Sequence, residues 1–400
     1  MNKRLCVDLR CNDPAEGSMA SPKEVWSLYL LGFVILVTIG CNNYVEEGKQ
    51  RRSKKSKELL RSSYGASVVE VRHPMEGVKV PSVYENLLDV SAKPEPAADA
   101  NEAGVNATGA ADEAAEAMPI FWHIEHSGGS SIVRVLGSCF SLVQASSYSS
   151  AQLPDQLSVA RIGDQKYATA DLTTPQGMQQ AKAQGLLSSQ RHLTDFIVTH
   201  RPYHLAQNLL DRSHNGRLFV LLRHPVHIVV SLFHHLKHLP PSHPQHDQTL
   251  QAMHIHDWIT QQHATLPDNI ILRTLLGYSD DRYARALTIT DLNTAKVILK
   301  QKALVGLLEQ KGPAMKRFQK YFGWNTDPSI YKNQARADQC LERSLHWGWL
   351  HKTDEHNELD VFNEDTSIYQ LIKEKNMFDC ELYEYAKYLF WLQGEELHLD

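Results

Sequence analysis

From residue 118 onward, short apolar runs alternate with longer stretches in which apolar positions recur every three or four residues. The short runs predict buried strands, and the longer stretches predict amphipathic helices. Expected strands cover 119–124, 195–199, 218–222, 296–299 and 303–307, and expected helices cover 130–143, 226–237, 248–264 and 312–322. Strands that alternate with helices favour parallel pairing. We therefore predict an α/β three-layer domain over 118–400 with a central, mainly parallel sheet.

A different pattern precedes this domain. Residues 25–41 form an uncharged apolar run, VWSLYLLGFVILVTIGC, of about the length that spans a bilayer. We interpret it as a transmembrane signal-anchor after a polar tail over 1–24, with a cleaved signal peptide and a buried helix as the alternatives. Residues 42–117 are predicted to form a flexible stem, because their second half is dominated by alanine, acidic residues and proline. The stem carries an N-glycosylation sequon at Asn106.

Composition narrows the class of protein. The chain has 400 residues, 42% of them hydrophobic, which is enough for one or two domains with buried cores. Its net charge of −5 gives no indication of nucleic acid as a partner. Six cysteines are too few for a disulfide framework, and we expect one bridge in the globular part, Cys340–Cys380. No cysteine spacing indicates a zinc site, and no metal is predicted.

The first chemical motif is the stretch IFWHIEHSGGSSI at 120–132. An expected strand ends there in a glycine loop, and hydroxyl residues open the expected helix. This arrangement directs unpaired backbone N–H groups at one place, which is how proteins hold phosphate or sulfate. We assign anion binding to the loop residues Ser127, Gly128, Gly129, Ser130 and Ser131.

The second motif is RLFVLLRHPVHIVVSLF at 217–233. Arg223 ends an expected strand, Pro225 begins a helix, and Ser231 follows on that helix. An arginine fork and a serine hydroxyl can clamp a second phosphate. A salt-bridged arginine and a surface serine are the alternative. Because the carboxyl ends of parallel strands share one edge, we expect this motif to lie beside the glycine loop.

Together these features resemble the Golgi-type, membrane-anchored carbohydrate sulfotransferases, relatives of the heparan sulfate 2-O-sulfotransferases. The two motifs resemble that family's W-H-I-P-K-[ST]-G-G-T-S loop and its L-R-[DN]-P sequence followed by serine. Later matches are NIILRTLLG at 269–277, ALVGLLE at 303–309, FGW at 322–324 and NMFDCELYEYA at 376–386. The resemblance implies a P-loop-like sulfotransferase architecture. It also implies that 3′-phosphoadenosine 5′-phosphosulfate (PAPS) binds with its 5′-phosphosulfate on the loop and its 3′-phosphate on Arg223 and Ser231.

The chain departs from the family at Glu125-His126, where the family has Pro-Lys. That lysine faces the oxygen that leaves with the phosphate, and His126 replaces it only when protonated. With an unperturbed pKa near 6.5, His126 is expected to be partly protonated in a mildly acidic lumen. His200, at the end of an expected strand, is the candidate general base for the acceptor hydroxyl, and His204 is its alternative.

The expected function is therefore PAPS-dependent transfer of a sulfuryl group, without a metal, to a hydroxyl of an oligosaccharide or proteoglycan chain. The resemblance implies a type II, single-pass glycoprotein of the Golgi membrane with a lumenal catalytic domain. Charge alone favours a cytosolic domain, because more basic residues follow the anchor than precede it. The alternatives are a catalytically impaired nucleotide- or glycan-binding protein and a nucleotide-dependent kinase, although the chain has no G-x4-G-K-[ST] motif. The oligomeric state is not predicted.

Overall fold

The computed structural model of the chain describes most of the predicted globular part. The described residues are 77–92, 117–146, 156–188, 191–262, 266, 268–278, 285–324, 334–346 and 366–399. The predicted tail, the signal-anchor over 25–41 and the sequon at Asn106 lie outside them. Within the described ranges, no helix combines the length and the apolarity that a membrane span requires.

The described part of the chain is built on a seven-stranded sheet with the order β3-β4-β2-β5-β1-β6-β7. All neighbouring strands pair in parallel except β3 and β4, which are antiparallel. The strands are β1 Met118–Trp122, β2 Val143–Ala145, β3 Val159–Ile162, β4 Gln165–Ala168, β5 Phe196–Thr199, β6 Gly216–Leu222 and β7 Ala303–Leu307. The predicted α/β domain with a mainly parallel sheet is confirmed.

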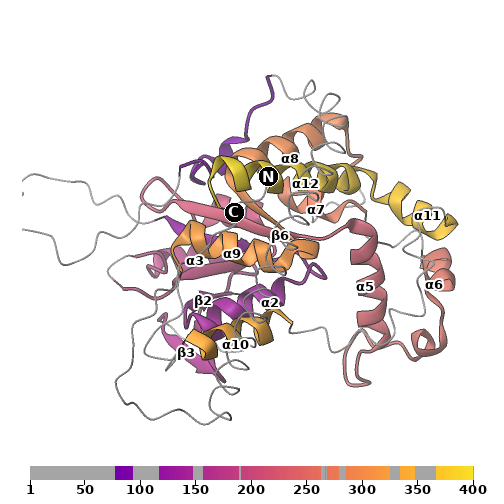
Figure 1. Cartoon of the computed structure of the whole chain (residues 1–400), viewed down its shortest axis with the longest axis horizontal. Helices are drawn as coiled ribbons and strands as arrows, with labels where there is room; N and C mark the ends of the chain where they lie inside the picture. Colours follow the sequence, from indigo (N-terminus) through magenta and orange to yellow (C-terminus); the bar gives the residue numbers. More distant parts are fainter. Residues whose placement is uncertain are drawn as a thin grey trace, which may run out of the picture. The chain divides into compact units, whose positions relative to one another are not determined.

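Helices connect the strands and pack around the sheet (Figure 1). They are α2 Gly129–Arg134, α3 Pro175–Ala183, α4 Pro202–Asn208, α5 Pro225–Lys237, α6 Ile255–Gln262, α7 Ile270–Leu275, α8 Ile289–Lys302, α9 Lys311–Phe322, α10 Gln334–Leu345, α11 Ser367–Lys375 and α12 Met377–Glu396. Shorter helical turns are η1 Ser82–Tyr84, η2 Val135–Cys139, η3 Gln248–Ala252 and η4 Leu308–Gln310.

The core lies where strands of the sheet are covered on both faces, and this includes the outermost strand β7. Every residue of β5 and β7 is buried, which agrees with the continuous apolar runs that indicated these strands. The outer strand β7 is protected along its edge by Gln393 of α12. The Gln393 side chain accepts a hydrogen bond from the backbone N–H of Val305 and donates one to the carbonyl of Ala303, each at 2.9 Å. This pairing keeps the edge of β7 from recruiting another strand.

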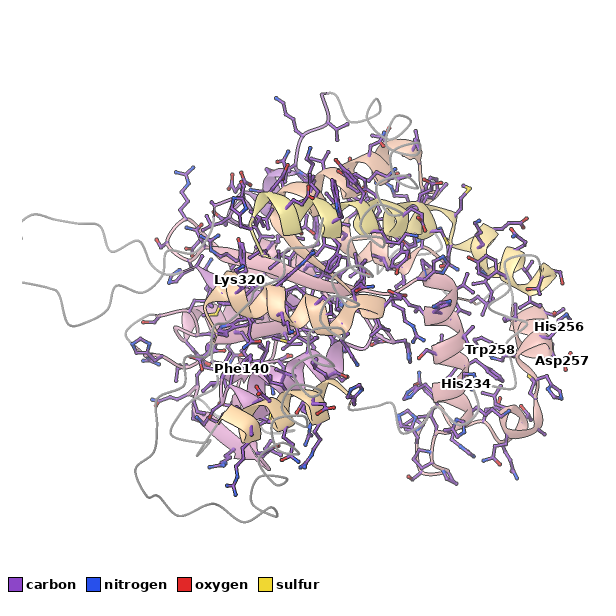
Figure 2. All side chains as sticks on the ribbon, in the orientation of Figure 1. Phe140, His234, His256, Asp257, Trp258 and Lys320 are labelled. Carbon is purple, nitrogen blue, oxygen red and sulfur yellow. A yellow bond between two sulfur atoms is a disulfide. The ribbon has the colours of Figure 1, made fainter. Side chains whose placement is uncertain are left out.

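A second apolar cluster joins α5, α6 and α11, which lie together at one end of the domain (Figure 1). Trp258 of α6, labelled in Figure 2, packs on Phe233 of α5 with ring centroids 5.3 Å apart. Ile372 of α11 is fully buried in the same cluster. The cluster fixes the direction of α5, the helix that follows the second predicted phosphate motif.

Three predicted elements need correction. The expected helix over 248–264 is divided into η3 Gln248–Ala252 and α6 Ile255–Gln262. The expected strand over 296–299 belongs to helix α8, which begins with a capping box formed by Thr288 and Asp291. The apolar run at 296–299 is a buried part of this helix. A short apolar run alone does not distinguish a buried strand from a buried helix segment. The expected helix over 130–143 ends at Cys139, and β2 begins at Val143.

Part of the predicted stem is folded onto the domain. Tyr84 is fully buried, and Leu87 forms a parallel bridge with Gly216 at the start of β6. The Tyr321 hydroxyl donates to the carbonyl of Val90 at 3.0 Å. Residues 77–92 therefore belong to the globular unit, because their apolar side chains Tyr84, Leu87 and Val90 are buried against the domain. The prediction of a flexible stem over 42–117 therefore does not apply to residues 77–92.

The predicted Cys340–Cys380 bridge is also wrong. Cys340 of α10 is joined to Cys139 of η2, and Cys380 of α12 is a free, buried thiol. Burial raises the pKa of the Cys380 thiol to about 12, so it is unreactive at neutral pH. Helix packing decides the pairing, because α10 lies against η2.

Candidate functional site

The candidate site lies at the carboxyl edge of three adjacent parallel strands, β5, β1 and β6. His200 follows β5, the glycine loop follows β1, and Arg223 follows β6. The backbone N–H of His123 donates to the carbonyl of Thr199 at 2.8 Å, so the chain segments after β1 and β5 run side by side. Sheet topology thus brings the two predicted motifs and His200 to one edge of the sheet.

Backbone conformation in the glycine loop depends on two left-handed residues, His126 with φ 60° and Gly128 with φ 76°. Gly128 is the N-cap of α2, and no side chain caps this helix. The two glycines are also sterically required. A Cβ at Gly128 would lie 2.6 Å from the Leu308 side chain, and a Cβ at Gly129 would lie 2.5 Å from the ring of His123. The loop is therefore closely packed from both sides.

The loop residues differ in how they are exposed. Ser130 is exposed and Gly128 is partly exposed, whereas Gly129 and Ser131 are buried. Ser127 is fully buried, and its hydroxyl has no hydrogen-bond partner among the described residues. Of the five predicted contact residues, only Gly128 and Ser130 are therefore exposed to solvent to any extent, and the other three are buried.

Arg223 joins the second motif to the first. Its Nη1 donates a hydrogen bond to the backbone carbonyl of His126 at 2.9 Å. Pro225 occupies the first position of α5, where a backbone N–H would have no partner within the helix, so its absence does not destabilise the helix. The His224 side chain caps the helix by accepting a hydrogen bond from the Val226 N–H. Ser231 lies in the second turn of α5 and is half-buried. No hydrogen bond joins Ser231 to Arg223 among the described residues.

His224 stands where the resembling family has an acidic or amide residue. Its ring stacks on Tyr369 at 6.0 Å and lies edge-on to Tyr383 at 5.3 Å. The Tyr383 hydroxyl donates to Glu309 at 2.6 Å. Burial, followed by the charge of neighbouring His227, lowers the pKa of His224 to about 4. His224 is therefore a neutral helix cap that connects the β6 edge to α11 and α12.

The His126 side chain faces His235 of α5, with ring centroids 5.4 Å apart. Burial lowers the pKa of His126 to about 4, and His235 and Arg223 add to the decrease while Glu125 opposes it. These neighbours favour a neutral His126 ring in the protein without ligand, whereas the prediction of a protonated ring concerns the protein with phosphosulfate bound. An anion beside the ring is needed to restore its positive charge.

His200 is exposed, as a group that meets an external acceptor must be. Its ring lies edge-on to His123 at 4.8 Å, and the His123 Nε2 is 3.4 Å from the Ser130 hydroxyl. Burial, with the charges of His200 and His126, lowers the pKa of His123 to about 4. His204, the alternative base, lies on α4 against Tyr203. His200 is thus connected to the glycine loop through His123.

Sequence reasoning missed Lys311, the first residue of α9. Its Nζ lies 3.4 Å from the Ser131 hydroxyl, and the residue is 9% exposed. The sequence could have indicated Lys311, because it lies only four residues after the end of β7. Residues that follow parallel strands meet at one edge of the sheet, and β7 is one of these strands.

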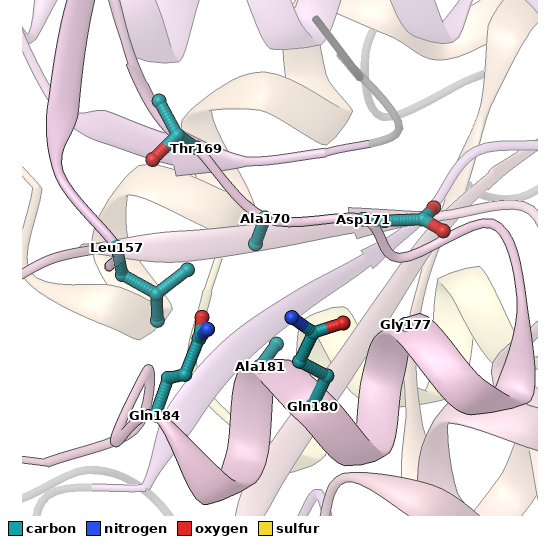
Figure 3. Close-up of a pocket in the computed structure, with 8 residues that line it drawn as sticks. All are labelled: Leu157, Thr169, Ala170, Asp171, Gly177, Gln180, Ala181 and Gln184. Atoms are coloured by element: carbon teal, nitrogen blue, oxygen red, sulfur yellow. The ribbon is translucent and has the colours of Figure 1, made fainter. Parts of the chain in front are cut away.

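Two other features bear on ligands. A small cavity lies between the segment after β4 and helix α3, lined in part by Leu157, Ala170 and Gln184 (Figure 3). It has room for about one water molecule, so it is too small for a nucleotide. No group of three potential metal ligands occurs within the described ranges.

Comparison of the chain with protein-family models, with curated proteins and with solved structures gives no match. The function is therefore inferred from the residues at the carboxyl edge of β5, β1 and β6.

Proposed function

We propose that the chain is a carbohydrate sulfotransferase that uses PAPS as donor and a glycan hydroxyl as acceptor. The hydrogen bond from Arg223 to the carbonyl of His126 carries the proposal, because it joins the two phosphate-type motifs at one edge of the sheet. PAPS bears a 3′-phosphate and a 5′-phosphosulfate on one ribose. Two adjoining anion sites of this kind suit such a molecule.

In this proposal Ser130 and the backbone at Gly128 and Gly129 hold the 5′-phosphosulfate. Arg223 and Ser231 hold the 3′-phosphate. A guanidinium has five N–H donors in a planar fork, so Arg223 can hold the loop through one donor while others meet a phosphate. The P-loop-like architecture of sulfotransferases belongs to the same proposal, and the parallel sheet with a glycine loop after β1 supports it.

His200 acts as the general base for the acceptor hydroxyl. It takes the hydroxyl proton while the acceptor oxygen forms a bond to sulfur, and the bond from sulfur to the bridging oxygen breaks as the bisphosphate (PAP) leaves. His123, packed edge-on at 4.8 Å, positions the His200 ring. General-base catalysis of this kind contributes about 10²–10⁴-fold in rate. Fixed donors in the loop stabilise the growing charge without a metal.

His126 stabilises the leaving oxygen once the anion has restored its proton. Burial and His235 hold the pKa of His126 at about 4 in the free protein, whereas a nearby phosphosulfate favours the protonated ring. The affinity for PAP should therefore increase as the pH is lowered from 7 towards 5.

The proposed location is the Golgi lumen, in a type II membrane protein anchored by 25–41. The Cys139–Cys340 bridge supports this, because disulfides persist in oxidising compartments and are rare in the cytosol. Glycosidase sensitivity that depends on Asn106 tests it, and an unglycosylated chain that is accessible from the cytosol would contradict it.

The full chain, solubilised in detergent, tests the donor site. Isothermal titration should detect PAP binding, and labelled PAPS should transfer sulfate to a mixture of glycosaminoglycans and oligosaccharides. Arg223→Gln should weaken PAP binding about 10- to 100-fold, because it removes a charged hydrogen-bond donor. Arg212→Gln, at an exposed arginine, is the matched control. Binding of Mg²⁺-ATP in place of PAP would indicate the kinase alternative.

A second candidate function is a nucleotide- or glycan-binding protein that has lost turnover. The neutral state of His126 favours it, because the leaving oxygen then lacks a cation at this position. His126→Lys distinguishes the two. Sulfate transfer by the native chain would exclude the second candidate. PAP binding without transfer, unchanged by lysine at position 126, would establish it.

A further inference from the structure

A buried lysine approaches the glycine loop from a distant part of the sequence. Lys311 begins α9, directly after η4 and close to the carboxyl end of β7. The residue is 9% exposed, and its Nζ lies 3.4 Å from the hydroxyl of Ser131 in the first turn of α2. Lysine is almost never fully buried unless it is paired, and the Ser131 hydroxyl is one partner of Lys311.

The segment that carries Lys311 is fixed against the same loop. Leu308 of η4 packs so closely on Gly128 that a Cβ there would lie 2.6 Å from its side chain. Lys311 therefore has a defined place behind the loop. Arg223 contacts the loop at the carbonyl of His126, and Lys311 contacts it at Ser131, so the two cations approach the loop from different strands.

A phosphosulfate bound at this loop needs nearby positive charge. Charge in a poorly hydrated site acts strongly over several ångströms, so an ammonium group behind the loop stabilises an anion in front of it without direct contact. We propose that Lys311 provides the positive charge for the 5′-phosphosulfate. The inference rests on the proposed PAPS site, and it assigns to a residue after β7 a permanent charge beside the one that His126 gains only when the anion is bound.

The competing explanation is structural: a lysine–serine hydrogen bond that only joins α9 to α2. Charge variants of Lys311, tested with ligands that differ by one phosphate, separate the two. PAP carries both phosphates, whereas adenosine 3′-phosphate lacks the 5′-phosphate that Lys311 is proposed to stabilise. A structural role requires the hydrogen bond to Ser131, which glutamine at position 311 can keep, whereas an electrostatic role requires the charge, which glutamine lacks. Either role concerns the loop, so adenosine 3′-phosphate serves to show that the rest of the site is intact.

The experiment measures the affinity of the full chain for both ligands by isothermal titration. Lys311→Met should weaken PAP binding about tenfold or more and leave adenosine 3′-phosphate unchanged. Lys311→Arg, which keeps the charge, should retain most of the PAP affinity. Lys320→Met is the matched control, because Lys320 is exposed on the same helix (Figure 2). Lys311→Gln, which keeps a donor for Ser131 but has no charge, should lose PAP affinity as Lys311→Met does, and circular dichroism checks that each variant is folded.

The outcomes are distinct. If the native chain binds PAP and Lys311→Gln keeps that affinity, or the variants lose both ligands equally or neither, Lys311 is structural and this inference is wrong while the PAPS site stands. If the native chain does not bind PAP, the proposed function itself fails. A loss confined to PAP in both Lys311→Met and Lys311→Gln, with affinity kept in Lys311→Arg, supports the inference.

Discussion

The disulfide between Cys139 and Cys340 provides a quantitative test of the fold. Its two cysteines are 201 residues apart, so the bridge closes a long loop in the unfolded chain. The chain-entropy relation gives about 5 kcal/mol for a loop of this length, and loss of native disulfides costs about 2–5 kcal/mol. We therefore expect Cys139→Ser with Cys340→Ser to lower the free energy of unfolding by about 2–5 kcal/mol.

The effect should also be local. The bridge holds α10 against η2, the continuation of the helix that follows the glycine loop. The Ser344 hydroxyl lies 3.4 Å from the Cys139 sulfur at the same contact. Without the bridge, α10 should exchange its backbone hydrogens faster than the strands of the sheet.

Thermal melting followed by circular dichroism measures the global effect. At roughly 2–4 °C per kcal/mol for a domain of this size, the double variant should melt about 5–20 °C below the native chain. Cys380→Ser is the control for removing a buried thiol that forms no bridge. A double variant that melts with the native chain, or peptide mapping that links Cys340 to Cys380, would refute the reasoning.

Three further predictions follow. Burial holds the pKa of His123, His126 and His224 at about 4, below the 6.5 of an unfolded chain, so the folded state binds these protons less readily. The free energy of unfolding should be highest above pH 6.5 and should decrease towards pH 4, and urea titrations at pH 7.5 and pH 5 should show this; equal stability would contradict it. Gly129→Ala should displace the His123 ring and cost about 1–3 kcal/mol in the same titration, and a neutral effect would mean that the loop is loosely packed. Asp379→Leu should cost about 1–3 kcal/mol, because two N–H groups of α7 lose their acceptor, whereas Asp379→Asn, which keeps one oxygen, should cost less; equal costs would argue against this capping role.

The central strands were predictable because their apolar runs are continuous. β1, β5 and β6 lie within two residues of their predicted bounds, and β7 matches its prediction. β2, β3 and β4 were missed because they are only three or four residues long, and the edge strand β3 is mostly exposed. Strands this short give too little pattern to recognise, since pairing with a neighbour is what defines them.

The meeting of the motifs was also predictable, because parallel strands place their carboxyl ends at one edge. Their detailed roles were not. Ser127 belongs to the motif by sequence but is fully buried. Lys311 lies 180 residues after Ser131 in the sequence. The strand order β1-β6-β7, which local sequence does not give, places them near each other. The protonation state of His126 depends on His235 and on burial, which local sequence does not report.

If the segments after β1 and β6 bind one nucleotide together, a crystal structure of the chain soaked with PAP should show both phosphates at this edge of the sheet. We expect the 5′-phosphate at Gly128 and Ser130 and the 3′-phosphate at Arg223, with His200 beside the open end of the 5′-phosphate. PAP bound elsewhere on the domain, or no bound PAP at saturating concentration, would contradict it.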